Sequence, residues 1–255
     1  MTAGELYAAL NQKIPTSLSC DWDNDGLMCC PDPEKKAERV LVALDITAEV
    51  VTRAIEGGYD VIVSHHPLIF SPLRAVEPHD PVAKKVIRLL CAGVTAMSFH
   101  TRLDAVEGGV NDVLANALGL ENVVPFGSDG EAIGRIGTLP QAMTVEAFAQ
   151  HAKRVLGADQ IVLADAGVAV QRVAVLGGGG SSDVAAAKCA GADTYLTGEL
   201  KHNNLMDAPE IGMNLLAGGH FHTENLVCNR ICELLHEIDA TLKVDVTDSN
   251  TACVL

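Results

Sequence analysis

The sequence has few aromatic side chains, no run of basic residues and no long apolar segment. Aromatic residues make up 4% of the 255 residues, whereas 48% are hydrophobic. A chain in which Ala, Val, Leu and Gly are abundant is typical of a parallel α/β sheet covered on both faces. Because no apolar run approaches the ~20 residues that a membrane-spanning helix needs, we expect no membrane partner.

The charge of the chain argues against a second class of partner. Lys and Arg number 18 against 33 Asp and Glu, which gives a formal net charge of −15. Binding to nucleic acids is driven by clustered basic residues that release counterions, so we expect no nucleic-acid partner. Such acidity favours solubility and weak adhesion to anionic surfaces.

The eight cysteines lack the paired CxxC pattern of a structural zinc site. Cys29 and Cys30 are adjacent, and Cys228 and Cys232 lie at helical spacing. The first residues show no basic segment followed by an apolar one, so we expect no secretory signal and a cytoplasmic protein with reduced thiols. We interpret the cysteines as small buried apolar residues.

The order of apolar segments predicts two related α/β lobes. A strand at residues 39–44, a helix at 48–56 and a strand at 60–64 form a βαβ unit, which continues with a helix at 81–91 and a strand at 94–99. A shift of 133 positions places Arg39 on Arg172 and Asp60 on Asp193, and the same pattern of elements follows. We therefore predict an α/β fold of the three-layer type with two related lobes; the central metal cleft between them is implied by the family resemblance described below.

A break at residues 125–130, rich in Pro, Gly, Ser and Asp, suggests the boundary between the lobes. We place residues 1–125 and 219–255 in the first lobe, which carries most of the candidate ligands, and residues 126–218 in the second. Near the end of the chain we expect a strand at 212–217, a turn at Gly218-Gly219 and one helix at 223–237.

Five of the nine histidines follow predicted strands, at three places in the chain. They are His65, His66, His100, His220 and His222. The carboxyl ends of parallel strands are where open α/β sheets place their chemistry. Two neutral imidazoles cannot neutralise a divalent ion, so a metal site also requires carboxylates.

Two carboxylates lie close to these histidines in the sequence. Asp104 is four residues beyond His100 on a predicted loop, and Glu224 is four residues beyond His220 across a helix start. The candidate metal ligands are therefore His65, His66, Asp104, His220 and Glu224. Several of these residues also have a simpler interpretation. The pair His65 and His66 can be structural, His100 can be a hydrogen-bonded core residue, and Asp104 can cap a turn.

Five ligands suffice for two divalent ions if Glu224 bridges them. Two ions bring four positive charges and the two carboxylates remove two, so the site attracts an anion even within an acidic protein. We expect metal-activated water to attack carbon or phosphorus, with His100 or His222 moving protons. The donor set admits Zn, Mn, Fe, Co or Ni.

Three polar motifs leave alternatives open. Asp21 to Gly26 matches the start of an EF-hand loop, but the twelfth position is Asp32 between two prolines, so we interpret the segment as an Asx-type turn. Residues 177–182 can cradle a phosphate or form a tight strand-to-helix turn. Residues 197–203 can line the cleft or form a surface loop.

Six motifs resemble the NGG-interacting-factor-like dinuclear metal proteins, often labelled GTP cyclohydrolase I type 2. They occur in one order along the chain, at residues 22–27, 64–67, 100–104, 177–182, 197–202 and 218–224. The resemblance implies two lobes around two divalent metals per chain, with the five ligands named above and Glu224 bridging. It also implies a hexameric ring of identical chains.

The function that we predict is a dinuclear metal-dependent hydrolase for a small anionic substrate, either a nucleotide, as in a GTP cyclohydrolase-like reaction, or a phosphate ester. The alternative is a ring-forming metal-binding or regulatory scaffold without catalytic activity. Two departures from the family pattern matter: His222 stands where a non-basic residue is expected, and the tail at residues 249–253 lacks an Asn-Pro-Phe-like ending.

Overall fold

A computed structural model gives the fold and describes residues 1–128 and 132–252. The chain forms two units, each with its own sheet. Unit 1 consists of Met1–Val106 and Val227–Thr251, and unit 2 of Glu107–Leu226 with Ala252. Cys253 of the tail and residues 129–130 of the predicted boundary segment lie outside the described residues.

The sheet of unit 1 has five strands in the order β1-β4-β3-β2-β11. Four strands are parallel, and β1 runs antiparallel to β4 at one edge. The strands are β1 (Gly26–Cys29), β2 (Arg39–Ala43), β3 (Val61–Ser64), β4 (Thr95–Ser98) and β11 (Lys243–Val246). All residues of β3 and β4 are buried, as expected for central strands that carry helices on both faces.

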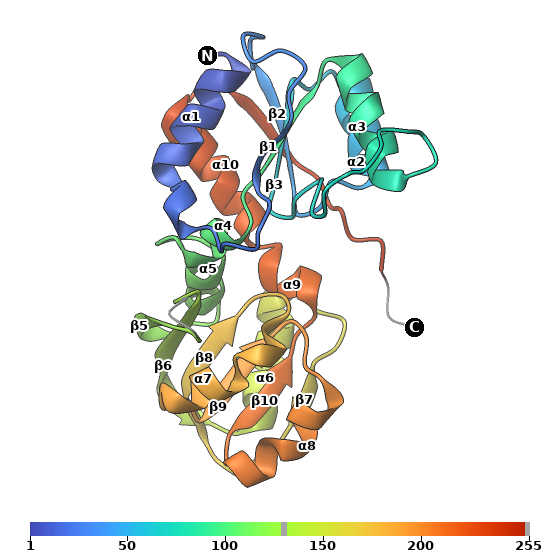
Figure 1. Ribbon diagram of the computed structural model, residues 1–255. Helices are drawn as coiled ribbons and strands as arrows, with labels where there is room; N and C mark the ends of the chain where they lie inside the picture. The colour runs from blue at the N-terminus through green and yellow to red at the C-terminus, as the bar shows by residue number, and fades with distance from the viewer. Residues whose placement is uncertain (129–131, 253–255) are drawn as a thin grey trace. The chain divides into compact units, whose positions relative to one another are not determined.

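Helices cover both faces of this sheet. Figure 1 shows α1 and α10 on one side and α2 and α3 on the other. The helices are α1 (Ala3–Lys13), α2 (Ala48–Glu56), α3 (Pro81–Ala92), α4 (Thr101–Ala105) and α10 (Val227–Ile238), and a 3-10 turn spans Thr16–Leu18. Alternate strand residues such as Leu41 and Ile62 pack with Val50 of α2 and Leu89 of α3 in one core.

Unit 2 has a six-stranded sheet in the order β5-β6-β8-β9-β10-β7. Here β8, β9 and β10 are parallel, and β5, β6 and β7 pair antiparallel with their neighbours. The strands are β5 (Glu121–Phe126), β6 (Gly134–Met143), β7 (Val162–Ala164), β8 (Val170–Leu176), β9 (Thr194–Thr197) and β10 (Asn214–Ala217). This unit is therefore also of the mixed α/β class.

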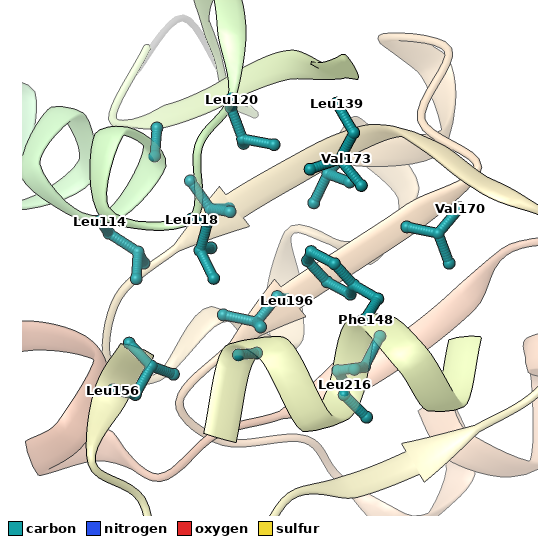
Figure 2. Close-up of a cluster of buried hydrophobic side chains, with 14 of the residues drawn as sticks. Leu114, Leu118, Leu120, Leu139, Phe148, Leu156, Val170, Val173, Leu196 and Leu216 are labelled. Atoms are coloured by element: carbon teal, nitrogen blue, oxygen red, sulfur yellow. The ribbon is translucent and has the colours of Figure 1, made fainter. Parts of the chain in front are cut away.

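Two separate cores lie on the faces of the second sheet. Figure 2 shows the first, in which Leu114 of α5 and Phe148 of α6 point toward Val173, Leu196 and Leu216 of the strands. On the other face, α7 and α8 contribute buried alanines. The helices are α5 (Val110–Ala117), α6 (Val145–Leu156), α7 (Val184–Cys189), α8 (His202–Ile211) and α9 (His220–Glu224), with a 3-10 turn at Gly180–Ser182.

Equivalent strands pair in the same register in both units, with the offset of 133 positions that the sequence repeat shows. In unit 1 Val40 pairs with Val61, and in unit 2 Val173 pairs with Thr194, so both partners move by the same 133 positions. The aspartate before the second strand has the same role in both units: Asp60 accepts hydrogen bonds from the backbone at residues 38 and 39, and Asp193 from that at residues 171 and 172.

Two local predictions differ from the structure. Residues 101–105 form the short helix α4 instead of a loop. The single helix predicted at 223–237 is two helices, α9 and α10, separated by Asn225 and Leu226. The break falls where the chain leaves unit 2, because α9 follows β10 whereas α10 packs on α1 and β2.

The boundaries between the units also lie elsewhere than the composition suggested. They fall at 106/107 and 226/227, compared with the predicted 125/126 and 218/219. Strand β5 pairs with β6 and therefore belongs to unit 2. Its mostly exposed residues, together with Pro125, hid it from a search for apolar segments. None of the helices within the described ranges has the length and apolar character needed to cross a bilayer.

Candidate metal site

Three of the predicted histidines meet at one edge of the sheet in unit 1. Strands β3 and β4 are parallel and in register, so their carboxyl ends lie side by side. His65 and His66 follow β3, and His100 follows β4. The ring centroids of His65 lie 4.9 Å from His66 and 5.2 Å from His100. One nitrogen from each ring lies within 4.8 Å of the others, and such a group can hold a metal ion.

Oxygen acceptors determine which ring nitrogen of His65 and of His66 acts as a hydrogen-bond donor. His65 Nδ1 lies 3.0 Å from the carbonyl oxygen of Phe99, and His66 Nδ1 lies 2.7 Å from Asp45 Oδ1. Because neither acceptor can donate a proton, each Nδ1 must donate, and each Nε2 then presents a lone pair. Histidine ligands of metals are oriented in this manner in proteins.

His100 is held by the acidic turn at residues 21–26. Its Nδ1 donates to Asp23 Oδ1 at 2.8 Å, and its backbone N–H donates to Asp25 Oδ2 at 3.1 Å. Asp23 also accepts two hydrogen bonds from Thr101, and Asp25 accepts one from Arg102. The D-x-D-x-D-G motif therefore anchors a histidine across the sheet edge, a contact that the reading as an Asx-type turn did not foresee.

These contacts keep Asp23 ionised. Burial opposes the charge, but the hydrogen bonds from His100 and Thr101 outweigh it and hold the pKa of Asp23 far below its usual range.

Asp104 belongs to α4 and faces His65. Its Oδ1 lies 3.7 Å from His65 Nε2, and both side chains are largely buried. Two donors bound to one ion at about 2.0–2.2 Å lie about 2.8–3.6 Å apart in octahedral or tetrahedral geometry. The spacing of His65 Nε2 and Asp104 Oδ1 is close to that range, so this pair fits a metal ion.

Unit 2 contains a second pair of the same kind. His220 begins α9 directly after β10, and Glu224 is one turn further on. His220 Nδ1 lies 3.0 Å from Glu199 Oε1, and its Nε2 lies 3.1 Å from Glu224 Oε2. If Nδ1 donates to Glu199, two acceptors face each other at Nε2. A cation at that point, either a second proton on the ring or a metal ion, is required to stabilise them.

Gly178 makes room for this second pair. Its φ is +67°, and a Cβ atom there would overlap Glu224 Oε1 and lie 3.0 Å from His220 Nε2. Only glycine combines this backbone conformation with such a close approach. The glycine-rich turn after β8 therefore serves the side chains of α9.

The same turn offers little to a phosphate group. Its backbone N–H groups already donate to side chains: Gly177 to Asn111 Oδ1, Gly178 to Thr223 Oγ1 and Gly180 to Thr197 Oγ1. Of the two readings left open by the sequence, this pattern favours the tight strand-to-helix turn. Residues 197–203 likewise end β9, supply Glu199 to the site and begin α8.

His222 lies apart from the His220–Glu224 pair. It sits two residues after His220 on α9, and successive helical residues two apart point to different sides of a helix. Its ring contacts that of Phe221 and borders a small hollow of about 180 Å³, together with Asp159, Gln160 and Gly198.

The comparisons with known proteins identify the family of this chain. The model of the family described as Duf34/NIF3 (NGG1p interacting factor 3) matches residues 1–252. This chain belongs to the Duf34/NIF3 family. A Clostridium perfringens relative named GTP cyclohydrolase 1 type 2 homolog is 33% identical over 242 residues, which cover 93% of this chain and 92% of that protein.

One further relative supports the family, and one solved structure supports the fold. The Schizosaccharomyces pombe protein NIF3 homolog is 31% identical over 255 residues, covering 91% of each chain. A crystal structure of a Bacillus cereus protein related to NIF3 superimposes with a TM-score of 0.91, at 24% identity, and covers 100% of this chain and 99% of the other. The predicted family and α/β fold class are thereby confirmed.

The anchoring carboxylates were not recognised from the sequence of this Duf34/NIF3 protein. Thr47 caps α2, and Asp45 contacts His66. Glu199 was considered only as part of residues 197–203, which could line the cleft or form a surface loop. All of these carboxylates follow strands at a sheet edge or precede the antiparallel β1, and this shared position is the signal that could have revealed them.

Proposed function

We propose that this Duf34/NIF3 protein is a dinuclear, divalent-metal-dependent hydrolase that acts on a small anionic substrate. The ligands would be three histidines and two carboxylates, with Glu224 bridging: His65, His66, Asp104, His220 and Glu224. One observation supports this most. In each unit a histidine held through Nδ1 presents Nε2 to a carboxylate oxygen, at 3.7 Å for His65–Asp104 and 3.1 Å for His220–Glu224.

The donors are of the types that Zn, Mn, Fe, Co and Ni accept. Two such ions, when bound, supply Lewis-acid polarisation of the substrate and activation of water near neutral pH. The protein residues Asp45 and Glu199 orient the rings of His66 and His220. The excess positive charge of the loaded site would favour an anion. A nucleotide or a phosphate ester meets that requirement.

His100 is the better placed of the two candidate proton carriers. Its ring lies 5.2 Å from that of His65 and 5.7 Å from that of His66, and its Nδ1 donates to Asp23 Oδ1. With Nδ1 engaged in this way, Nε2 is the nitrogen that would exchange a proton with the substrate. His222 would be a second carrier that acts from the other side of α9.

Activity and metal content together test this proposal. Protein expressed without added metal is analysed for its elements, and the metal-loaded protein is assayed against nucleoside triphosphates and phosphate esters. We expect two divalent ions per chain and turnover that His65→Ala and Glu224→Ala abolish. His236→Ala, an exposed histidine on α10, serves as the matched control and should retain full turnover. Absence of turnover in fully loaded protein would contradict the enzymatic proposal.

The alternative is a ring-forming scaffold that binds metal without turnover. The family description, which names a factor that interacts with NGG1p, favours this reading to some degree. Both readings include the hexameric ring that the resemblance implies, and light scattering of the purified protein tests it. A scaffold would show two bound metals and a stable hexamer, but no substrate in the panel would be consumed.

A further inference from the structure

Two aromatic side chains of unit 1 are exposed to solvent. The chain contains one Trp, three Tyr and five Phe, all of which lie in the described ranges. Trp22 is 62% exposed and Phe70 is 53% exposed, whereas the other seven are buried or half-buried. In a protein so poor in aromatic residues, two exposed rings at one place point to a ligand.

Both rings lie beside His100. The ring centroid of Trp22 is 6.2 Å from that of His100 and 6.4 Å from that of Phe70, and Phe70 and His100 are 6.0 Å apart. The three planes cross at 65°, 81° and 89°, so they contact edge to face. The rings therefore form a corner in which a flat molecule can lie on one ring while its edge meets another.

The segments that carry the two rings are tied to each other and to the histidines. Asn24 Nδ2 donates to the carbonyl oxygen of Ile69, which joins the turn before β1 to the segment after β3. The neighbouring Asp23 holds His100. Because the corner is preorganised, little conformational entropy is lost when a ligand enters.

The surroundings of Phe70 offer no net charge. It borders a hollow of about 680 Å³ in which Arg74 and Lys85 are matched by Glu77 and Asp80. An isolated phosphate group would find no excess of positive charge there. The chemistry of the corner instead suits an uncharged, planar ring system that binds through its face.

We propose that Trp22 and Phe70 bind a planar heteroaromatic ring of the substrate, such as a nucleobase, and hold it next to His100. The reaction that follows rests on the proposed function, but the ring-binding step does not. Within the substrate classes named above, this selects compounds that carry a base over simple phosphate esters. Trp22 and Phe70 are thus specificity-determining residues.

The single tryptophan makes the binding step directly measurable. Guanosine and adenosine are titrated into the full-length protein while Trp22 fluorescence is recorded, with ribose 5-phosphate as the probe that lacks a base. We expect saturable quenching by both nucleosides and none by ribose 5-phosphate. Phe70→Ala should raise the dissociation constant about 5- to 150-fold, which corresponds to the ~1–3 kcal/mol of one base–aromatic stack.

Two control variants separate stacking from general apolar contact. Phe70→Leu keeps an apolar side chain but loses the ring, and it should weaken binding nearly as much as Phe70→Ala. Val76→Ala, at a residue that is 60% exposed in the same loop, should leave the dissociation constant unchanged. Equal affinity in the Leu variant and the native protein would overturn the stacking proposal.

Other outcomes distinguish this proposal from the proposed hydrolase function. Quenching that persists in His65→Ala and in chelated protein, with no turnover, supports ring binding even if the hydrolase proposal fails. Absence of quenching by either nucleoside in protein that does bind metal overturns ring binding alone. If Trp22→Ala instead lowers the oligomeric mass measured by light scattering, the corner is a contact between chains and the proposal is wrong.

Discussion

Replacing Asp23 by alanine should destabilise unit 1 more than most single substitutions do. The side chain is 0% exposed and accepts hydrogen bonds from His100 Nδ1 at 2.8 Å, Thr101 N at 3.0 Å and Thr101 Oγ1 at 2.7 Å. Asp23→Ala leaves these donors without an acceptor in a mostly buried place. Each buried unsatisfied group costs about 1–3 kcal/mol, and breaking a buried charged pair costs about 3–5 kcal/mol.

We therefore expect the free energy of unfolding of unit 1 to fall by about 3–5 kcal/mol. With an m value of about 2 kcal/mol/M in urea, the midpoint should fall by roughly 1.5–2.5 M. Trp22, the only tryptophan, lies in unit 1 and reports its unfolding by fluorescence, separately from the far-ultraviolet circular dichroism of the whole chain.

The control is Asp21→Ala, an exposed aspartate in the same turn, which should change the free energy of unfolding by less than about 0.5 kcal/mol. A midpoint for Asp23→Ala within the error of the Asp21→Ala midpoint would refute the argument that the acidic turn is a structural anchor of His100.

Three further predictions concern the metal ligands and the sheet edge. Gly178→Ala should weaken Co²⁺ binding about 10- to 100-fold in spectroscopic titrations, because its Cβ would displace Glu224. The control is Gly179→Ala, where a Cβ meets no atom within 4 Å, and this variant should bind Co²⁺ as the native protein does. Removal of metal by chelation should lower the free energy of unfolding by about 2.7 kcal/mol, compared with protein in metal at 100 times its dissociation constant. Equal urea midpoints with and without metal would disprove that the metal binds only the folded protein. Asp60→Asn should destabilise the protein at pH 7 but progressively less below about pH 4, measured as the difference in urea midpoint from the native protein. Burial opposes ionisation of Asp60, but hydrogen bonds from the backbone N–H groups of residues 38 and 39 and from Lys35 lower its pKa overall. The ionised carboxylate therefore stabilises the folded protein, and this contribution is lost as pH falls through the lowered pKa. A difference in urea midpoint that stays constant down to low pH would exclude this linkage.

Strand ends were predictable from the sequence because a β-branched run that stops at polar residues marks them directly. His65 and His66 follow such a run, whereas His100 follows the mostly apolar segment 94–99. Parallel pairing then brings these ends to one edge, as the register of Ser64 with Ser98 shows. The pairing of His220 with Glu224 followed in the same way from helical spacing.

Contacts that depend on antiparallel pairing between distant segments were not predictable. Strand β1 begins where β4 ends, with Gly26 opposite Ser98, and only this pairing carries Asp23 to His100. No local periodicity of a four-residue, half-exposed strand indicates its partner. Likewise, nothing in the apolar pattern of residues 220–238 marks the break at Asn225, which falls where the chain passes from unit 2, with α9, to unit 1, with α10.

Because residues 107–226 of unit 2 lie between the two segments of unit 1, the ribosome synthesises nearly all of unit 2 before it completes unit 1. At about 5–20 residues per second, synthesis of residues 107–226 separates the two segments of unit 1 by roughly 6–24 s. During that interval β2 is an open edge that lacks β11, and α1 lacks its neighbour α10. The nascent chain therefore exposes an aggregation-prone strand while its inserted neighbour is already complete, and chaperones should engage the first hundred residues at that stage.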